Sequence, residues 1–136
     1  MRKNRILVVD DDALQRLITA RLLEANGFEA RVAADGPQAL RLIPTFRPDL
    51  VVLDVMMPNV NGYRVSRMIK TLVKHSKLRV PKVLLLTARR VNSIRSQELL
   101  EFSMADTMMF KPYNPVTLVA TIEALLTDNE VLPTAA

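Results

Sequence analysis

The sequence predicts an α/β protein built on a doubly wound sheet of five parallel strands. Short runs of Val, Leu and Ile recur along the chain without polar alternation, which is typical of strands buried on both faces. Segments with the helical period of apolar residues lie between these runs. Five strand–helix units in alternation imply a parallel sheet covered by helices on both faces, and right-handed crossovers favour the doubly wound topology.

The strand runs are clearest at Ile6–Val9, Leu50–Leu53 and Val83–Leu86. The sequence predicts ten elements in the order strand 5–9, helix 13–25, strand 28–33, helix 36–43, strand 50–54, helix 62–74, strand 82–86, helix 93–103, strand 107–110 and helix 115–126.

Three of the helices carry apolar stripes at the spacing expected for a face that packs on a sheet. The stripes consist of Leu14, Leu17, Ile18 and Leu22, of Val65, Met68, Ile69 and Leu72, and of Leu118, Val119, Ile122, Leu125 and Leu126.

Helix ends are marked by capping residues and by prolines. Asp12 with Gln15, and Asp35 with Gln38, have the spacing of capping boxes. Asn114 before Pro115 is expected to begin the last helix, and Asn26-Gly27 to end the first. Pro44 and Pro48 are expected to end the second helix at residue 43.

The length of 136 residues fits one domain, which we place at 1–126, with a mobile tail or linker remnant at 127–136. The chain has no cysteine and one histidine, which argues against disulfides, Cys- or His-based metal sites and a Ser-His-Asp triad. No apolar run is long enough to span a membrane or to form a signal peptide, so we expect a soluble, cytoplasmic protein.

Polar side chains follow the predicted strands where each strand ends. In a doubly wound sheet these positions meet at one edge, where ligands bind. Carboxylates crowded there repel one another unless a cation lies among them, and oxygen ligands without His or Cys favour Mg²⁺. Together with a hydroxyl and an ammonium, they can move a phosphoryl group onto an aspartate. The residues are Asp10, Asp11, Asp12, Asp54, Thr87, Lys111 and Pro112.

Over residues 4 to 126 the sequence resembles bacterial response-regulator receiver domains, the CheY-like modules of two-component signalling. The resemblance implies a flavodoxin-like receiver fold with strand order 2-1-3-4-5. The matching segments, in order, are Ile6-Leu7-Val8-Val9-Asp10-Asp11-Asp12, Pro48-Asp49-Leu50-Val51-Val52-Leu53-Asp54-Val55-Met56-Met57-Pro58 with Asn61-Gly62, Leu86-Thr87-Ala88, and Lys111-Pro112.

The resemblance implies that Asp54 is the phosphoacceptor. It also implies an Mg²⁺ ion held by Asp11 directly, by Asp10 partly through water, by Asp54, and by the backbone carbonyl of Met56. Asp12 stands at a variable position of the family and is interpreted as a helix cap.

Three further roles follow from the same resemblance. Thr87 would hydrogen-bond the phosphoryl group and move with it, Lys111 would pair with that group, and the peptide bond before Pro112 would be cis. The family usually has an aromatic switch residue where this chain has Met108, and often a glycine where it has Met104.

The net charge of +5 hides an uneven distribution, because residues 55–97 carry ten Lys and Arg and no acid. We interpret this stretch first as a solvated face, and second as a docking surface for an acidic partner or nucleic acid. Nucleic acid is an unlikely partner for this chain alone, because no DNA-reading motif or row of aromatics accompanies the charge. Five basic residues have helical spacing and are expected to form one stripe: Arg64, Arg67, Lys70, Lys74 and Lys77.

The leading functional hypothesis is a phosphorelay module, either standing alone or belonging to a longer regulator. A histidine kinase or phosphotransfer protein would phosphorylate Asp54 and so switch a surface that binds a downstream target or output domain, and phosphorylation could also drive dimerisation. Such a module is no enzyme beyond its own phosphorylation and dephosphorylation. A phosphohydrolase would need a second acid where Met56 stands. The remaining alternative is a phosphorylation-independent adaptor that docks partners through its basic 64–95 face.

Overall fold

The computed structural model describes residues 2–57, 60–88 and 93–128. Its main sheet has five parallel strands in the order β2-β1-β3-β6-β7, which is the predicted 2-1-3-4-5 order counted along the chain. The strands are β1 (Arg5–Val9), β2 (Glu29–Ala33), β3 (Leu50–Asp54), β6 (Lys82–Thr87) and β7 (Thr107–Phe110).

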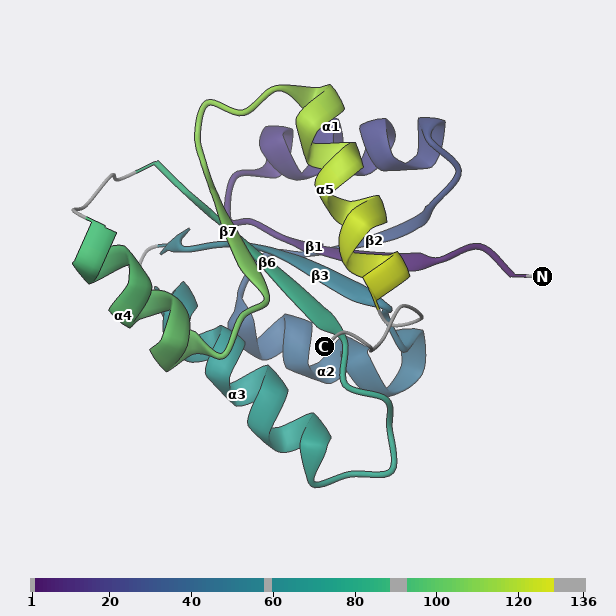
Figure 1. Cartoon of the computed structure of the whole chain (residues 1–136). Helices are drawn as coiled ribbons and strands as arrows, with labels where there is room; N and C mark the ends of the chain where they lie inside the picture. The colour runs from purple at the N-terminus through teal and green to yellow at the C-terminus, as the bar shows by residue number, and fades with distance from the viewer. Residues whose placement is uncertain (1, 58–59, 89–92, 129–136) are drawn as a thin grey trace.

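Helices cover both faces of this sheet, as the doubly wound prediction requires (Figure 1). One layer contains α1 and α5, and the other contains α2, α3 and α4. In the described part of the chain, no helix is long and apolar enough to cross a membrane. The helices are α1 (Ala13–Ala25), α2 (Gly36–Phe46), α3 (Gly62–Lys74), α4 (Ser93–Ser103) and α5 (Pro115–Asp128).

Alternate strand residues supply two separate cores. Leu7, Val51 and Leu85 point toward the α2 and α3 layer, whereas their neighbours Leu50 and Leu84 point toward α1 and α5. All of these side chains are fully buried. Because consecutive strand residues face opposite sides, a central strand covered on both faces must be apolar throughout, which is why the runs lack alternation.

The expected caps form, but the capping boxes form only in part. Asp12 accepts hydrogen bonds from the backbone N–H groups of Leu14 and Gln15, and Asp35 accepts one from Gln38. The Gln15 side chain does not return to Asp12; it donates to the Tyr113 hydroxyl at 3.5 Å. Other caps follow the prediction, with Asn114 accepting from the N–H of Val116 and with Gly27 at a φ of +90° after α1.

Helix α2 does not end at residue 43, contrary to the prediction from Pro44. It continues to Phe46, whose buried ring joins the same core as Ile43. Pro44 lies in the last turn, where one lost hydrogen bond is offset by this burial. Arg47 then ends the helix in the left-handed conformation, with its N–H donating to the Ile43 carbonyl at 2.8 Å.

The stripe predicted for α1 is wrong, because Leu14, Leu17 and Ile18 are exposed. The helix instead buries Thr19, Ala20 and Leu23, and Leu22 is only partly buried. The α3 stripe is half right, with Val65 and Ile69 buried but Met68 and Leu72 exposed. The α5 stripe is confirmed, since Leu118, Ile122 and Leu125 are buried.

Three boundaries differ slightly from the prediction. Strand β2 begins at Glu29 and not at Phe28, because the Phe28 N–H donates a hydrogen bond to the Leu23 carbonyl at the end of α1. Strand β6 extends to Thr87. Helix α5 reaches Asp128, so the first two residues of the predicted tail are helical. Residues 129–136, the rest of that tail, lie outside the described part of the chain.

The predicted basic stripe is divided in the structure. Lys77 lies beyond α3, which ends at Lys74, and Lys70 turns inward to Asp106, its Nζ lying 2.7 Å from Oδ2. Arg64, Arg67 and Lys74 remain exposed on α3. Arg89 and Arg90 of the proposed 64–95 face lie outside the described residues.

A short antiparallel pair, β4 (Met56–Met57) and β5 (Val60–Asn61), connects β3 to α3 and was not predicted. It brings Gly62 against the end of β3. A Cβ added at Gly62 would lie 2.5 Å from the Cα of Val55 and 2.9 Å from the carbonyl oxygen of Asp54. Only glycine fits this close approach of two backbones.

We therefore expect Gly62→Ala to destabilise the fold by about 2 kcal/mol or more, because backbone atoms must move. The matched control is Gly27→Ala, where space is open and only the left-handed φ is unfavourable, at a cost of about 1 kcal/mol. Urea unfolding of both variants measures the difference. A Gly62→Ala variant as stable as wild type would contradict the close approach.

Candidate functional site

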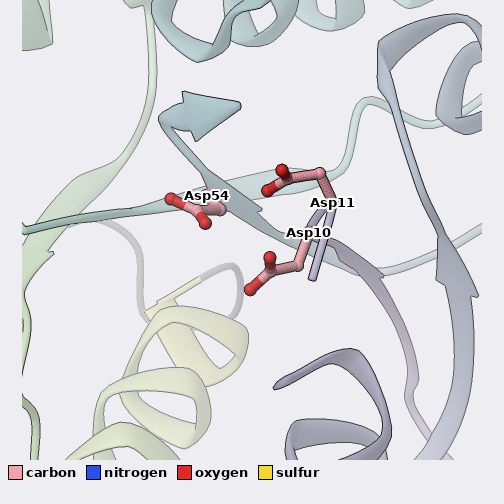
Figure 2. A group of neighbouring side chains, drawn as sticks. All are labelled: Asp10, Asp11 and Asp54. Carbon is pink, nitrogen blue, oxygen red and sulfur yellow. The ribbon is translucent and has the colours of Figure 1, made fainter. Parts of the chain in front are cut away.

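Three carboxylates meet at the carboxyl edge of the sheet. Asp10 and Asp11 follow β1, and Asp54 is the last residue of β3, the neighbouring strand. One carboxylate oxygen from each lies within 4.8 Å of the others (Figure 2). Asp10 and Asp54 are only 4% and 5% exposed, whereas Asp11 is exposed to solvent.

The Asp54 carboxylate is held at both oxygens. Its Oδ1 accepts a hydrogen bond from the Met56 N–H at 3.0 Å, and its Oδ2 lies 3.2 Å from Lys111 Nζ. Lys111 follows β7, two strands away across the sheet. The Met56 backbone thus lies beside the carboxylate cluster, where its N–H group makes the contact with Asp54, and the ligand role of its carbonyl stays a prediction.

Asp10 is almost fully buried within the cluster. Burial raises the pKa of its carboxyl group, the hydrogen bond from the Asp12 N–H lowers it, and the nearby negative charge of Asp54 raises it again. The Asp12 N–H is available for this 2.9 Å bond to Asp10 Oδ1 because Gln15 does not complete the capping box. The helix cap therefore also orients a carboxylate of the site.

This donor set fits a hard divalent cation. Buried carboxylates that repel one another gain most from a positive charge placed among them, and all the available ligand atoms are oxygens. Receiver-type acidic pockets generally bind Mg²⁺, and the cluster of Asp10, Asp11 and Asp54 has the required composition.

Thr87 and Lys111 complete the edge. Thr87 ends β6, is almost fully buried and pairs in register with Phe110. The Lys111 N–H donates to the Thr87 carbonyl at 2.8 Å, and the Lys111–Pro112 peptide bond is cis. The backbone thus fixes Lys111 next to Thr87 while its ammonium group reaches Asp54.

Met108 lies on β7 opposite Leu85 and is partly buried against the core formed by α2 and α3. Met104 ends α4 in the left-handed conformation, at a φ of 61°, which explains why glycine suits this position. Tyr113 is an aromatic beside the site, and its hydroxyl is 3.4 Å from Thr19 Oγ1.

Sequence reasoning missed one neighbour of the site, Arg16. Its guanidinium donates to the Asp10 carbonyl at 2.8 Å and so ties the first turn of α1 to the β1 loop. No motif marks this residue, although a basic side chain one helical turn after three aspartates was a signal that could have been used.

Comparisons with known proteins agree with the fold of the chain. A model of the response regulator receiver domain family matches residues 6–123. Among solved structures, a CheY-like receiver domain protein from Methanospirillum hungatei superposes with a TM-score of 0.81 at 26% identity, over 94% of this chain and 97% of that one. The chemotaxis protein CheY4 of Vibrio cholerae gives 0.78 at 27% identity, over 90% of this chain and 98% of that one.

Curated relatives extend the similarity to longer proteins. The DNA-binding response regulator MtrA of Mycolicibacterium paratuberculosis is 38% identical over 96% of this chain and 55% of its own length. The response regulator MprA of Mycolicibacterium vanbaalenii is 43% identical over 90% of this chain and 50% of its own length. The chain thus spans about half the length of these relatives, and it belongs to the response regulator receiver domain family.

Proposed function

We propose that this receiver domain accepts a phosphoryl group on Asp54 and thereby switches a protein-interaction surface in phosphorelay signalling. The single observation that supports this most strongly is the setting of Asp54. Its carboxylate lies between two further carboxylates suited to a cation and the ammonium group of Lys111, 3.2 Å away.

In the proposed step, a carboxylate oxygen of Asp54 attacks the phosphorus atom of the donor. A new P–O bond forms and the bond from phosphorus to the donor breaks, which is a P–N bond when the donor is a phosphohistidine. The leaving nitrogen keeps the bonding electrons and the product is an aspartyl phosphate. Lys111 holds the carboxylate before transfer and pairs with a phosphoryl oxygen afterwards.

Mg²⁺ would be held by the carboxylates of Asp10, Asp11 and Asp54 and by the Met56 carbonyl, and when bound it neutralises the negative charge that gathers during transfer. Asp10 and Asp54 enter this arrangement already positioned, because the N–H groups of Asp12 and Met56 hold them. Little side-chain freedom is lost when the ion binds.

We further propose that the phosphoryl group draws the Thr87 hydroxyl toward it and that this movement changes the surface formed by α4 and β7. Thr87 ends β6, the strand that leads toward α4, and its carbonyl accepts a hydrogen bond from the backbone N–H of Lys111. Met108 replaces the usual aromatic switch residue here, so we expect it to adjust by repacking, since an unbranched thioether fills space in several rotamers.

Receiver domains interact with histidine kinases and with output domains. For this chain we propose a histidine kinase or a phosphotransfer protein as the phosphoryl donor, in the cytoplasm, and a downstream protein or output domain as the target. A dimer that forms on phosphorylation is part of this proposal. The alternative of a phosphorylation-independent adaptor is not favoured, because an adaptor has no need of a buried carboxylate pair beside a lysine.

The proposal predicts that acetyl phosphate with Mg²⁺ adds one phosphoryl group to the protein, seen as a single mass shift of the intact chain. Asp54→Asn removes the acceptor and abolishes the shift, whereas Asp35→Asn, which keeps a capping oxygen for α2, leaves the shift unchanged. No shift in wild type would refute the proposal, and rapid multiple turnover would instead favour a phosphohydrolase.

A second variant separates uptake from signalling. Met108→Tyr lies on β7, outside the carboxylate cluster, so phosphoryl uptake should stay within about twofold of wild type. Affinity for the partner that recognises the phosphorylated surface should change by about fivefold or more, because the residue that couples to Thr87 is altered. Binding titration and intact-mass kinetics on the same sample measure both. Equal loss of uptake and affinity would show that Met108 belongs to the phosphoryl site.

A further inference from the structure

The outer side of α3 is both basic and apolar. The helix carries four basic residues and no acid along Gly62–Lys74. Two large apolar side chains, Met68 and Leu72, are 45% and 56% exposed on it, one helical turn apart. Exposed apolar side chains bordered by charges of one sign are typical of protein interaction surfaces.

A groove of about 800 Å³ runs beside this surface. Side chains from three helices line it, and none of the described residues lining it is acidic. Pro37 and Leu40 come from α2, Arg64, Val65 and Met68 come from α3, and Phe102, which is 44% exposed, comes from α4.

The positive charge at the groove is not neutralised within the described part of the chain. Arg64 has no ion-pair partner there, and Arg67 bonds only to the neutral carbonyl of Phe102, at 2.8 Å. The same guanidinium stacks over the Phe102 ring, 5.1 Å from its centroid. This cation–π contact holds Arg67 at the edge of the groove without neutralising its charge.

We propose that the groove between α2, α3 and α4 docks an acidic amphipathic helix of a partner protein. Its apolar side chains would cover Leu40, Met68 and the part of Phe102 that Arg67 leaves exposed, and its carboxylates would meet Arg64 and Arg67. The proposal goes beyond phosphoryl transfer, because none of these residues belongs to the carboxylate cluster. Nucleic acid fits less well, since the floor is aliphatic and the ring of Phe102 is already covered by Arg67.

The test is fluorescence anisotropy with a labelled probe peptide of roughly 18 residues, long enough to form a helix. The probe carries leucines at i, i+3, i+4 and i+7, glutamates beside this apolar stripe and alanines on the rest of the helix. Binding should weaken about tenfold in Arg64→Glu and in Met68→Glu, which remove a charge contact and an apolar contact. A probe with the same composition but scattered leucines should bind at least about tenfold more weakly than the original.

The matched controls are Arg21→Glu and Leu14→Glu, which also replace an arginine and a large apolar residue by glutamate, at exposed positions of α1 across the sheet. Both should bind the probe within about twofold of wild type, and all four variants should take up phosphate from acetyl phosphate normally. Three results would overturn the proposal: no binding by wild type at low salt, equal weakening by the α1 variants, or tighter Arg64-dependent binding of a DNA duplex.

Discussion

The mutual repulsion of three carboxylates at one edge of the sheet is the constraint on which the rest of the site depends. Asp10 and Asp54 are almost fully buried, yet their negative charges lie within a few ångströms of each other and of Asp11. Such a cluster is unfavourable by itself and becomes favourable when a cation lies within it. Lys111 balances one charge through Asp54, which leaves a net negative pocket suited to a divalent ion.

The fold holds this unfavourable cluster together by burying apolar side chains on both sides of the sheet. Residues just before the site, such as Val8 and Leu53, are buried in the two cores, so the strand ends cannot separate. Backbone N–H groups then fix the carboxylates locally, and Gly62 lets α3 begin against the end of β3. The stability of the cores thus maintains a geometry that the charges alone would disperse.

The sequence predicted which residues meet at the carboxyl edge of the sheet, because strand-end positions of a parallel sheet meet regardless of details elsewhere. It predicted helix faces less well. In α1 the apolar period fits two overlapping faces, and Leu23 with two small residues is buried where Leu14 and Leu17 were expected. The end of α2 predicted from Pro44 was wrong, because the unfavourable helix propensity of proline is outweighed by the burial of Phe46 in the core. The hydrogen bond from the Asp12 N–H to Asp10 could not be predicted from the sequence, since it depends on whether the Gln15 side chain contacts Asp12 or Tyr113.

Thermal unfolding of wild type and Asp10→Asn at neutral pH, with and without MgCl₂, tests the cluster most directly. Because the pKa of Asp10 is raised on folding, its ionised form costs stability above the ordinary aspartate pKa. Without Mg²⁺ the variant should therefore unfold at a higher temperature than wild type, a gap that closes at acid pH. Excess Mg²⁺ should raise the unfolding temperature of wild type. It should raise that of the variant much less. A wild type indifferent to Mg²⁺, or a less stable Asp10→Asn, would contradict the account.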